Sequence, residues 1–266
     1  MALRPAVHTF NWIPWAHRQK VTLDIERVLG EAREAGFDAV EFSRVPMELD
    51  DAARTARLLE KLGITLAGMS FTYKGLPGTW QELKDHARVL ADLGGKVAVF
   101  FDSTDWQKLA PAGADSGLHD TVQAAETFAE FAATLGLYTA YHNHLRTNLE
   151  TPAQIDAVVP KLKRAGFCID TGHLIAAKGD PVAFIRRYAS KIRHVHFKDT
   201  EFKPDGTIAE FVELGAGNHS YRVDDWLTAL RETGYDGWLT VEQDQTKTTP
   251  FESARANRDW LRQRGV

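Results

Sequence analysis

The sequence of 266 residues has little of what disulfide-bonded, membrane-spanning or nucleic-acid-binding proteins need. Cys168 is its single cysteine, which excludes an internal disulfide and any metal site built from several thiolates. The formal net charge is -4 and Lys and Arg form no clustered run, so a nucleic-acid partner is not expected. Apolar runs stay below the roughly 18 residues of a membrane span, and the amino terminus resembles no signal peptide. We therefore expect a soluble, cytoplasmic protein without a membrane or nucleic-acid partner.

Short apolar segments alternate with longer amphipathic segments from one end of the chain to the other. This alternation is typical of a parallel sheet whose strands are connected by helices. The predicted strands span residues 6–12, 39–44, 65–71, 96–101, 138–144, 165–170, 192–197 and 237–243. Most of them follow a glycine that indicates a helix end, namely Gly36, Gly63, Gly94, Gly136, Gly166 or Gly234.

A doubly wound open sheet would share such helix-to-strand connections. Eight strand–helix units in a chain of this length favour instead one closed α/β (β/α)8 TIM barrel, a single domain over residues 1–266. The longest irregular stretches, 102–117 and 200–220, both follow strands. We expect both on the catalytic face, where barrel enzymes carry their substrate loops.

Ionisable side chains gather at the carboxyl ends of the predicted strands, where buried barrel strands are otherwise apolar. Asp170 ends the sixth strand, His196 lies near the end of the seventh, and Glu242 near the end of the eighth. Alternate strand residues face opposite ways, so His194, His196 and Lys198 share one side of the seventh strand. Carboxylates and an imidazole that converge on the barrel axis suit one divalent ion, Mn, Mg, Co or Zn.

Each of these residues also fits a structural role when it is taken alone. A strand-end histidine often bonds a backbone carbonyl, Asp170 could cap a helix, and Glu242 could form an ion pair with Lys198. Their convergence on three consecutive strands favours the metal site.

Four segments resemble the xylose isomerase-like barrel superfamily of sugar isomerases, epimerases and endonuclease IV. They are YHNHLRTNLET (141–151), DTGH (170–173), HVHFKD (194–199) and WLTVEQD (238–244), and they are most similar to the inosose dehydratase branch. The resemblance implies a metal held by a Glu after strand five, an Asp after strand six, a His after strand seven and a Glu after strand eight. Asp170, His196 and Glu242 match the last three.

The fifth strand departs from this family pattern. Where many relatives have Leu-Glu-Asn, this chain has Tyr141-His142-Asn143. Either His142 binds the metal, or Glu150 reaches back from the following loop. We favour Glu150, because a further carboxylate keeps the hard-cation character of the site. Glu150 could also be a solvated residue before a helix that starts near Pro152. The loop VELGAGNHSYR lacks the carboxylate–X–histidine pair of endonuclease IV, so DNA repair is not expected.

The chemistry that this site implies starts at a carbonyl polarised by the metal, next to which a base removes a proton. His142 and His144 are the candidate bases. Lys198 and His173 could shuttle protons or bind substrate, and Glu41 could be a further acid–base group. Lys198 could instead pair with Asp199 or Glu242, and Glu41 with Arg44.

Candidate substrate-binding residues are aromatic or basic and lie near the same face. Most aromatic residues of barrels belong to the core, which is the structural alternative for these. Besides His173, the candidates are Trp12, Phe71, Trp106 and Arg222.

The expected function is that of a metal-dependent isomerase or epimerase of a sugar or polyol ketone. A lyase of the inosose dehydratase type, or one acting on 3-keto-glycosides, is the alternative, and a non-catalytic sugar-binding barrel is a third possibility. The expected partner is a small sugar or cyclitol, and homo-oligomers are compatible with the sequence.

Overall fold

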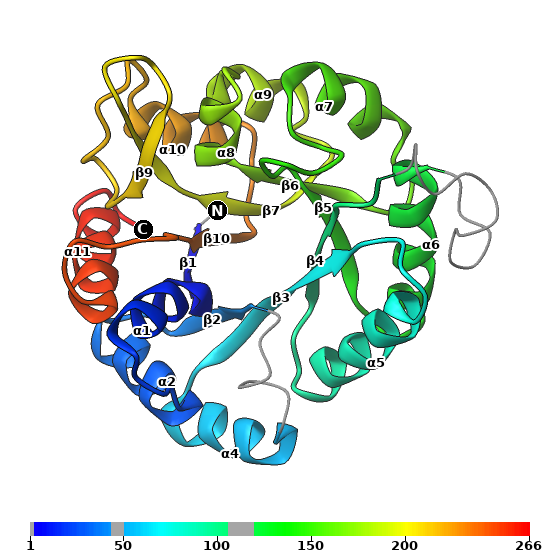
Figure 1. The fold of residues 1–266 in the computed structure, drawn as a ribbon, viewed down its shortest axis with the longest axis horizontal. Coiled ribbons are helices and arrows are strands. Elements are labelled where there is room, and N and C mark those ends of the chain that lie inside the picture. Colours follow the sequence, from blue (N-terminus) through cyan, green and yellow to red (C-terminus); the bar gives the residue numbers. More distant parts are fainter. Residues whose placement is uncertain (1–2, 44–50, 106–119) are drawn as a thin grey trace.

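The computed structural model describes residues 3–43, 51–105 and 120–266. Within these ranges eight parallel strands form a closed barrel in the order β1-β10-β7-β6-β5-β4-β3-β2, and helices surround it as an outer ring (Figure 1). The barrel strands are β1 (Arg4–His8), β2 (Ala39–Phe42), β3 (Thr65–Tyr73), β4 (Val97–Asp102), β5 (Tyr138–His142), β6 (Gly166–Asp170), β7 (Ile192–Phe197) and β10 (Trp238–Val241). The predicted TIM barrel is confirmed.

The helices follow the strands. Most of them are preceded by a residue whose side chain accepts a hydrogen bond from a backbone N–H of the first turn. They are α1 (Ile13–Gln19), α2 (Ile25–Glu34), α4 (Ala52–Leu62), α5 (Thr79–Asp92), α6 (Thr121–Thr134), α7 (Pro152–Val158), α8 (Thr171–Ala176), α9 (Pro181–Arg187), α10 (Val223–Glu232) and α11 (Pro250–Arg262), with 3-10 turns at Thr9–Trp12 and Val159–Lys161. No helix of the described ranges is both long and apolar enough to span a membrane.

Five of the six glycine signals lie at helix ends with positive φ, as at Gly36 and Gly234. Gly166 differs, because it lies inside β6. A side chain there would meet the aliphatic part of Arg193 and the carbonyl oxygen of Lys191, so this glycine permits close strand packing. The first strand also ends earlier than predicted. The Nδ1 atom of His8 accepts the Phe10 N–H at 3.0 Å and turns the chain into the 3-10 helix.

Aromatic side chains fill the layer between the sheet and the helices. Phe71 of β3 is fully buried there, with its ring centroid 5.1 Å from that of Phe128 on α6. Its neighbour Ser70 points the other way and hydrogen-bonds inside the barrel. The expectation that Phe71 walls a sugar is therefore corrected: it is a core residue.

The stretch 200–220, expected to be irregular, begins as a hairpin. Strands β8 (Asp199–Phe202) and β9 (Ile208–Val212) pair antiparallel directly after β7. The hairpin brings Phe211 beside the barrel mouth, where its ring lies 4.5 Å from the Lys198 amine and 4.9 Å from the His173 ring. It thereby closes one side of the site described next.

Candidate metal centre and active site

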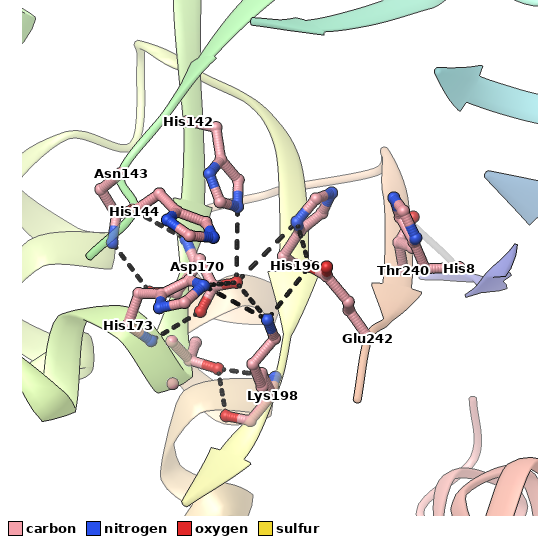
Figure 2. A network of polar contacts seen from close by, with 12 residues as sticks. His8, His142, Asn143, His144, Asp170, His173, His196, Lys198, Thr240 and Glu242 are labelled. Carbon is pink, nitrogen blue, oxygen red and sulfur yellow. Dashed lines mark hydrogen bonds and ion pairs between the residues drawn. The ribbon is translucent and has the colours of Figure 1, made fainter. Parts of the chain in front are cut away.

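Four side chains meet at the carboxyl ends of four barrel strands. His142 ends β5, Asp170 ends β6, His196 lies in β7, and Glu242 directly follows β10. One potential ligand atom from each lies within 4.8 Å of those of the other three. Figure 2 shows His142, His196 and Glu242 directed towards the carboxylate of Asp170. The structure thus brings the predicted Asp170, His196 and Glu242 together, and adds His142.

The facing atoms of this group are buried without hydrogen-bond partners. Nδ1 of His196 lies 2.8 Å from Oε2 of Glu242 and 3.8 Å from Oδ2 of Asp170, and Nε2 of His142 lies 3.4 Å from the same Oδ2. All four atoms lack a hydrogen-bond partner within the described ranges. Buried polar atoms without partners are costly and rare. Two imidazole nitrogens and two carboxylate oxygens are suitable ligands for one divalent ion, so the residues present fit a metal.

Asp170 is held so that one oxygen remains available. Oδ1 accepts the His173 N–H at 2.7 Å and caps α8, while Oδ2 faces the other three ligands. The Asn143 side chain bonds the Asp170 N–H at 2.8 Å and its carbonyl oxygen at 3.1 Å. The capping role considered from the sequence is therefore real, and it leaves the second oxygen directed at the other ligands and at the Lys198 amine, 3.5 Å away.

Glu41 holds His196 from beneath, deep inside the barrel. Its Oε1 is 2.9 Å from Nε2 of His196 and its Oε2 is 2.6 Å from Nε2 of His194. Because a carboxylate accepts hydrogen bonds, Nε2 of His196 carries a hydrogen that faces Glu41. Burial lowers the pKa of His196, but Glu41 and Glu242 beside its two nitrogens raise it to about 10, and a bound metal would take the place of the hydrogen on Nδ1. Burial opposes ionisation of Glu41, but the histidines around it hold the pKa of this carboxyl well below its usual value.

Lys198 is buried beside the ligand group among three carboxylates. Its amine lies 3.0 Å from Asp244, 3.2 Å from Glu242 and 3.5 Å from Asp170. Burial disfavours a charged amine, but these carboxylates raise the pKa of Lys198 well above its usual value. The pair with Glu242 considered from the sequence is present, whereas Asp199 instead bonds His219 at 2.6 Å.

A cavity of about 420 Å³ lies over the ligand group, and His142, His196 and Glu242 form part of its wall. His144 lies on the same wall, stacked on Phe101 with a centroid distance of 5.5 Å. Its Nδ1 lies 2.7 Å from the Leu145 carbonyl oxygen and so carries the hydrogen, which leaves Nε2 as the basic nitrogen.

Sequence reasoning missed eight residues of this wall, which are His8, Phe10, Ser43, Ser70, Thr72, Lys74, Phe101 and Asp244. The position of Asp244 could have been predicted, because it stands two residues after Glu242 and alternate residues of a strand face the same side. Phe101 could have been found in the same way at the end of the fourth strand. Lys74 follows β3 in a loop, for which strand parity gives no signal.

His173, a predicted substrate-binding residue, lies between the ligand group and the hairpin. Its Nε2 atom is 3.3 Å from the Lys198 amine, and its ring centroid is 3.9 Å from that of His144. Burial and the Lys198 charge hold the pKa of His173 well below its usual value, so its ring is neutral.

Other predicted site residues lie elsewhere. Glu150 is outside the ligand group, because its carboxylate accepts the Arg146 N–H at 3.0 Å within the loop. Trp12 is fully buried and donates to Glu31 at 2.6 Å. Arg222 precedes α10 and lines a separate cavity. Trp106, like Arg44, falls outside the described residues. Glu41 is fully buried and is not among the described residues of the cavity wall.

Comparison with known proteins agrees with the barrel fold. The family model described as "Xylose isomerase-like TIM barrel" matches residues 29–264. The chain belongs to this family. Inosose dehydratase 1 of Bacillus cereus is 27% identical over 277 residues, which cover 90% of this chain and 89% of the relative. The predicted resemblance to the inosose dehydratase-like branch is confirmed.

Two solved structures of the same fold are similar along nearly the whole chain. The IOLI protein with a binding zinc atom has a TM-score of 0.78 at 17% identity, and covers 97% of this chain and 96% of its own. L-ribulose 3-epimerase has a TM-score of 0.71 at 21% identity, with coverages of 98% and 94%. At these identities the likeness shows the fold.

Proposed function

We propose that this protein is a divalent-metal-dependent enzyme that removes a proton from the carbon next to the carbonyl of a sugar or cyclitol ketone. The observation that carries the proposal is the convergence, beneath an open cavity, of four buried ligand atoms that have no hydrogen-bond partner in the described ranges. A divalent ion held there would act as a Lewis acid that polarises the carbonyl and acidifies the neighbouring C–H. The IOLI protein, which has the same fold, binds a zinc atom, and this supports a metal in a barrel of this kind.

The proposed ligands are His142, Asp170, His196 and Glu242. Glu150 leaves the set, because its carboxylate is engaged within its own loop. His142 joins the proposed ligands, and its ring is neutral because burial and the nearby His196 lower its pKa to about 3. A neutral imidazole is the form that binds metals. His142 then cannot also be the base, because its nitrogen lone pair is directed at the ligand group.

His144 is the proposed base. Its Nδ1 atom faces the Leu145 carbonyl oxygen, so Nε2 is the nitrogen that can accept a proton, and its ring lies on the cavity wall next to the ligands. Lys198 donates hydrogen bonds to developing negative charge on substrate oxygen. Protonated His144 then returns the proton to the substrate, while Asp244, which lines the same cavity, holds the Lys198 amine in place at 3.0 Å. Return of the proton to another carbon gives isomerisation, and return to the other face of the same carbon gives epimerisation.

A second candidate reaction is dehydration, in which the same proton abstraction is followed by loss of a β-hydroxyl. The similarity to inosose dehydratases over 90% of the chain favours it. Both reactions share their first step, so a single assay of proton abstraction tests the common proposal.

The test is deuterium exchange into ketones in D2O, followed by nuclear magnetic resonance. Protein loaded with Mn²⁺, Co²⁺ or Zn²⁺ is incubated with D-allulose, L-ribulose and 2-keto-myo-inositol. We expect exchange next to the carbonyl for at least one ketone, loss of exchange on chelation, and strong loss in His144→Gln. An epimer marks the first reaction, and an ultraviolet-absorbing dehydrated product marks the second. Metal-loaded protein that exchanges none of these protons would refute the proposal.

A further inference from the structure

A second cavity adjoins the first at the barrel mouth. Its volume is about 330 Å³, and it shares two wall residues, His144 and Asp244, with the cavity over the ligand group. Its outer wall comes from the hairpin, the loop after β5 and the segment after β10. It consists of Leu145, Arg146, Ile208, Ala209, Glu210, Phe211 and Gln245, with His173 beneath. Each cavity reaches the roughly 300 Å³ at which ligand pockets begin. The mouth therefore has room for a ligand of two parts.

The charges on the second wall are balanced except for one cation. Glu210 pairs with Lys247 at 2.9 Å, and Asp244 pairs with Lys198 at 3.0 Å. The side chain of Arg146 forms no ion pair with any residue in the described ranges. Its guanidinium can thus donate hydrogen bonds to ligand oxygens, and Ile208 and Phe211 offer apolar surface.

The loop that carries Arg146 is fixed in an unusual conformation. Arg146 has φ 62°, a left-handed conformation that non-glycine residues seldom adopt. Glu150 stabilises it by accepting the Arg146 N–H at 3.0 Å, and the Thr147 hydroxyl donates to the His144 carbonyl oxygen at 2.7 Å. Glu150 therefore shapes the second cavity, although it lies outside the metal group.

We propose that the substrate carries a second group, O-linked to the ring that bears the ketone, and that the second cavity binds this group. The ring lies over the metal ligands, and the linked group passes His144 and Asp244 to reach Arg146, Ile208 and Phe211. This inference rests on the proposed function and specifies its substrate class as keto-glycosides larger than a single ring.

The test compares two ligands that share a ring. Methyl and phenyl 3-keto-D-glucoside have a carbonyl flanked by hydroxyls and differ only in the linked group, and their binding to metal-loaded protein is measured by calorimetry. We expect the phenyl compound to bind about tenfold more tightly or better, because a buried aromatic ring contributes enough for such a factor. Ala209→Trp fills the second cavity from an exposed position and should bring this ratio close to one.

Lys203→Trp is the matched control, since it adds the same bulk at an exposed hairpin position outside the described cavity wall and should keep the wild-type ratio. With a glucosyl group in place of phenyl, Arg146→Met should weaken binding of that ligand alone. Equal affinities for the methyl and phenyl compounds, or a ratio that Ala209→Trp leaves unchanged, would overturn the second subsite only. Absence of binding by every ligand would overturn the proposed function and this inference with it.

Discussion

Replacing Glu41 by glutamine tests whether the barrel interior sets the tautomer of His196. In the structure both carboxylate oxygens accept hydrogen bonds, at 2.9 Å from His196 and 2.6 Å from His194. A glutamine side chain keeps one acceptor and replaces the other by an N–H donor. When that donor faces Nε2 of His196, the ring must carry its hydrogen on Nδ1, the atom directed at the other ligands.

The expected loss follows from the effect of such outer partners on metal sites. Removing the carboxylate behind a metal-bound histidine typically costs 10–100-fold in metal affinity, about 1.4–2.8 kcal/mol. Glu41 is fully buried, so solvent cannot replace its hydrogen bonds. We therefore expect Glu41→Gln to weaken metal binding by at least tenfold.

The assay is competition for Zn²⁺ and Mn²⁺ against a metal-sensitive dye, with urea unfolding measured in parallel. Thr240→Val is the control, because Thr240 bonds His194 at 3.0 Å, and within the described ranges its hydroxyl forms no hydrogen bond with His196. This variant should lose about 1 kcal/mol of stability at nearly unchanged metal affinity. Wild-type metal affinity in Glu41→Gln would refute the argument, and so would an equal loss in both variants.

Three further substitutions separate ligands from supporting residues. Glu242→Gln should abolish stoichiometric metal binding with an unchanged circular dichroism spectrum, and metal retained in the purified variant would contradict its place in the ligand set. Glu150→Gln should keep the metal and lose about 1 kcal/mol of unfolding free energy, because the Arg146 N–H loses a charged acceptor; loss of metal would return Glu150 to the ligand set. Phe71→Ala should cost about 3–5 kcal/mol of unfolding free energy at unchanged metal affinity, and a selective effect on metal binding would refute its assignment to the core.

Strand patterns predicted the barrel because each of its strands carries its own apolar signal. The errors lie where the chain leaves the strands. Residues 9–12 follow the first strand without a break in apolar character, and the early end depends on the hydrogen bond between His8 and the Phe10 N–H. The hairpin after β7 was not predicted, because its polar residues, such as Glu201 and Glu210, are typical of a loop.

The predicted site was most accurate where strand parity applies. Asp170, His196 and Glu242 belong to strand ends, so alternation brings them to the barrel axis. The same alternation would have excluded Phe71, since Ser70 faces the axis. Glu150 could not be placed from the sequence, because its direction depends on the left-handed turn at Arg146. Asp244 has the right parity and ends the segment WLTVEQD, but no role was predicted for it, because the family pattern implies a metal ligand in this segment only at Glu242.

In the proposed metal centre, the histidine at the end of the fifth strand determines which metal we expect the site to prefer. Asp170 and Glu242 contribute two negative charges, and Asp244 balances the buried Lys198, so a divalent ion makes the proposed centre neutral. Two imidazoles among four ligands favour Zn²⁺, Co²⁺ or Mn²⁺ over Mg²⁺, which prefers oxygen. His142→Glu would add a third carboxylate, and we expect it to raise the affinity for Mg²⁺ relative to Zn²⁺ in the same dye competition. An unchanged Mg²⁺ to Zn²⁺ ratio in this variant would show that His142 lies outside the metal's ligands, and the proposed set would then fail at the one position where this chain departs from its family.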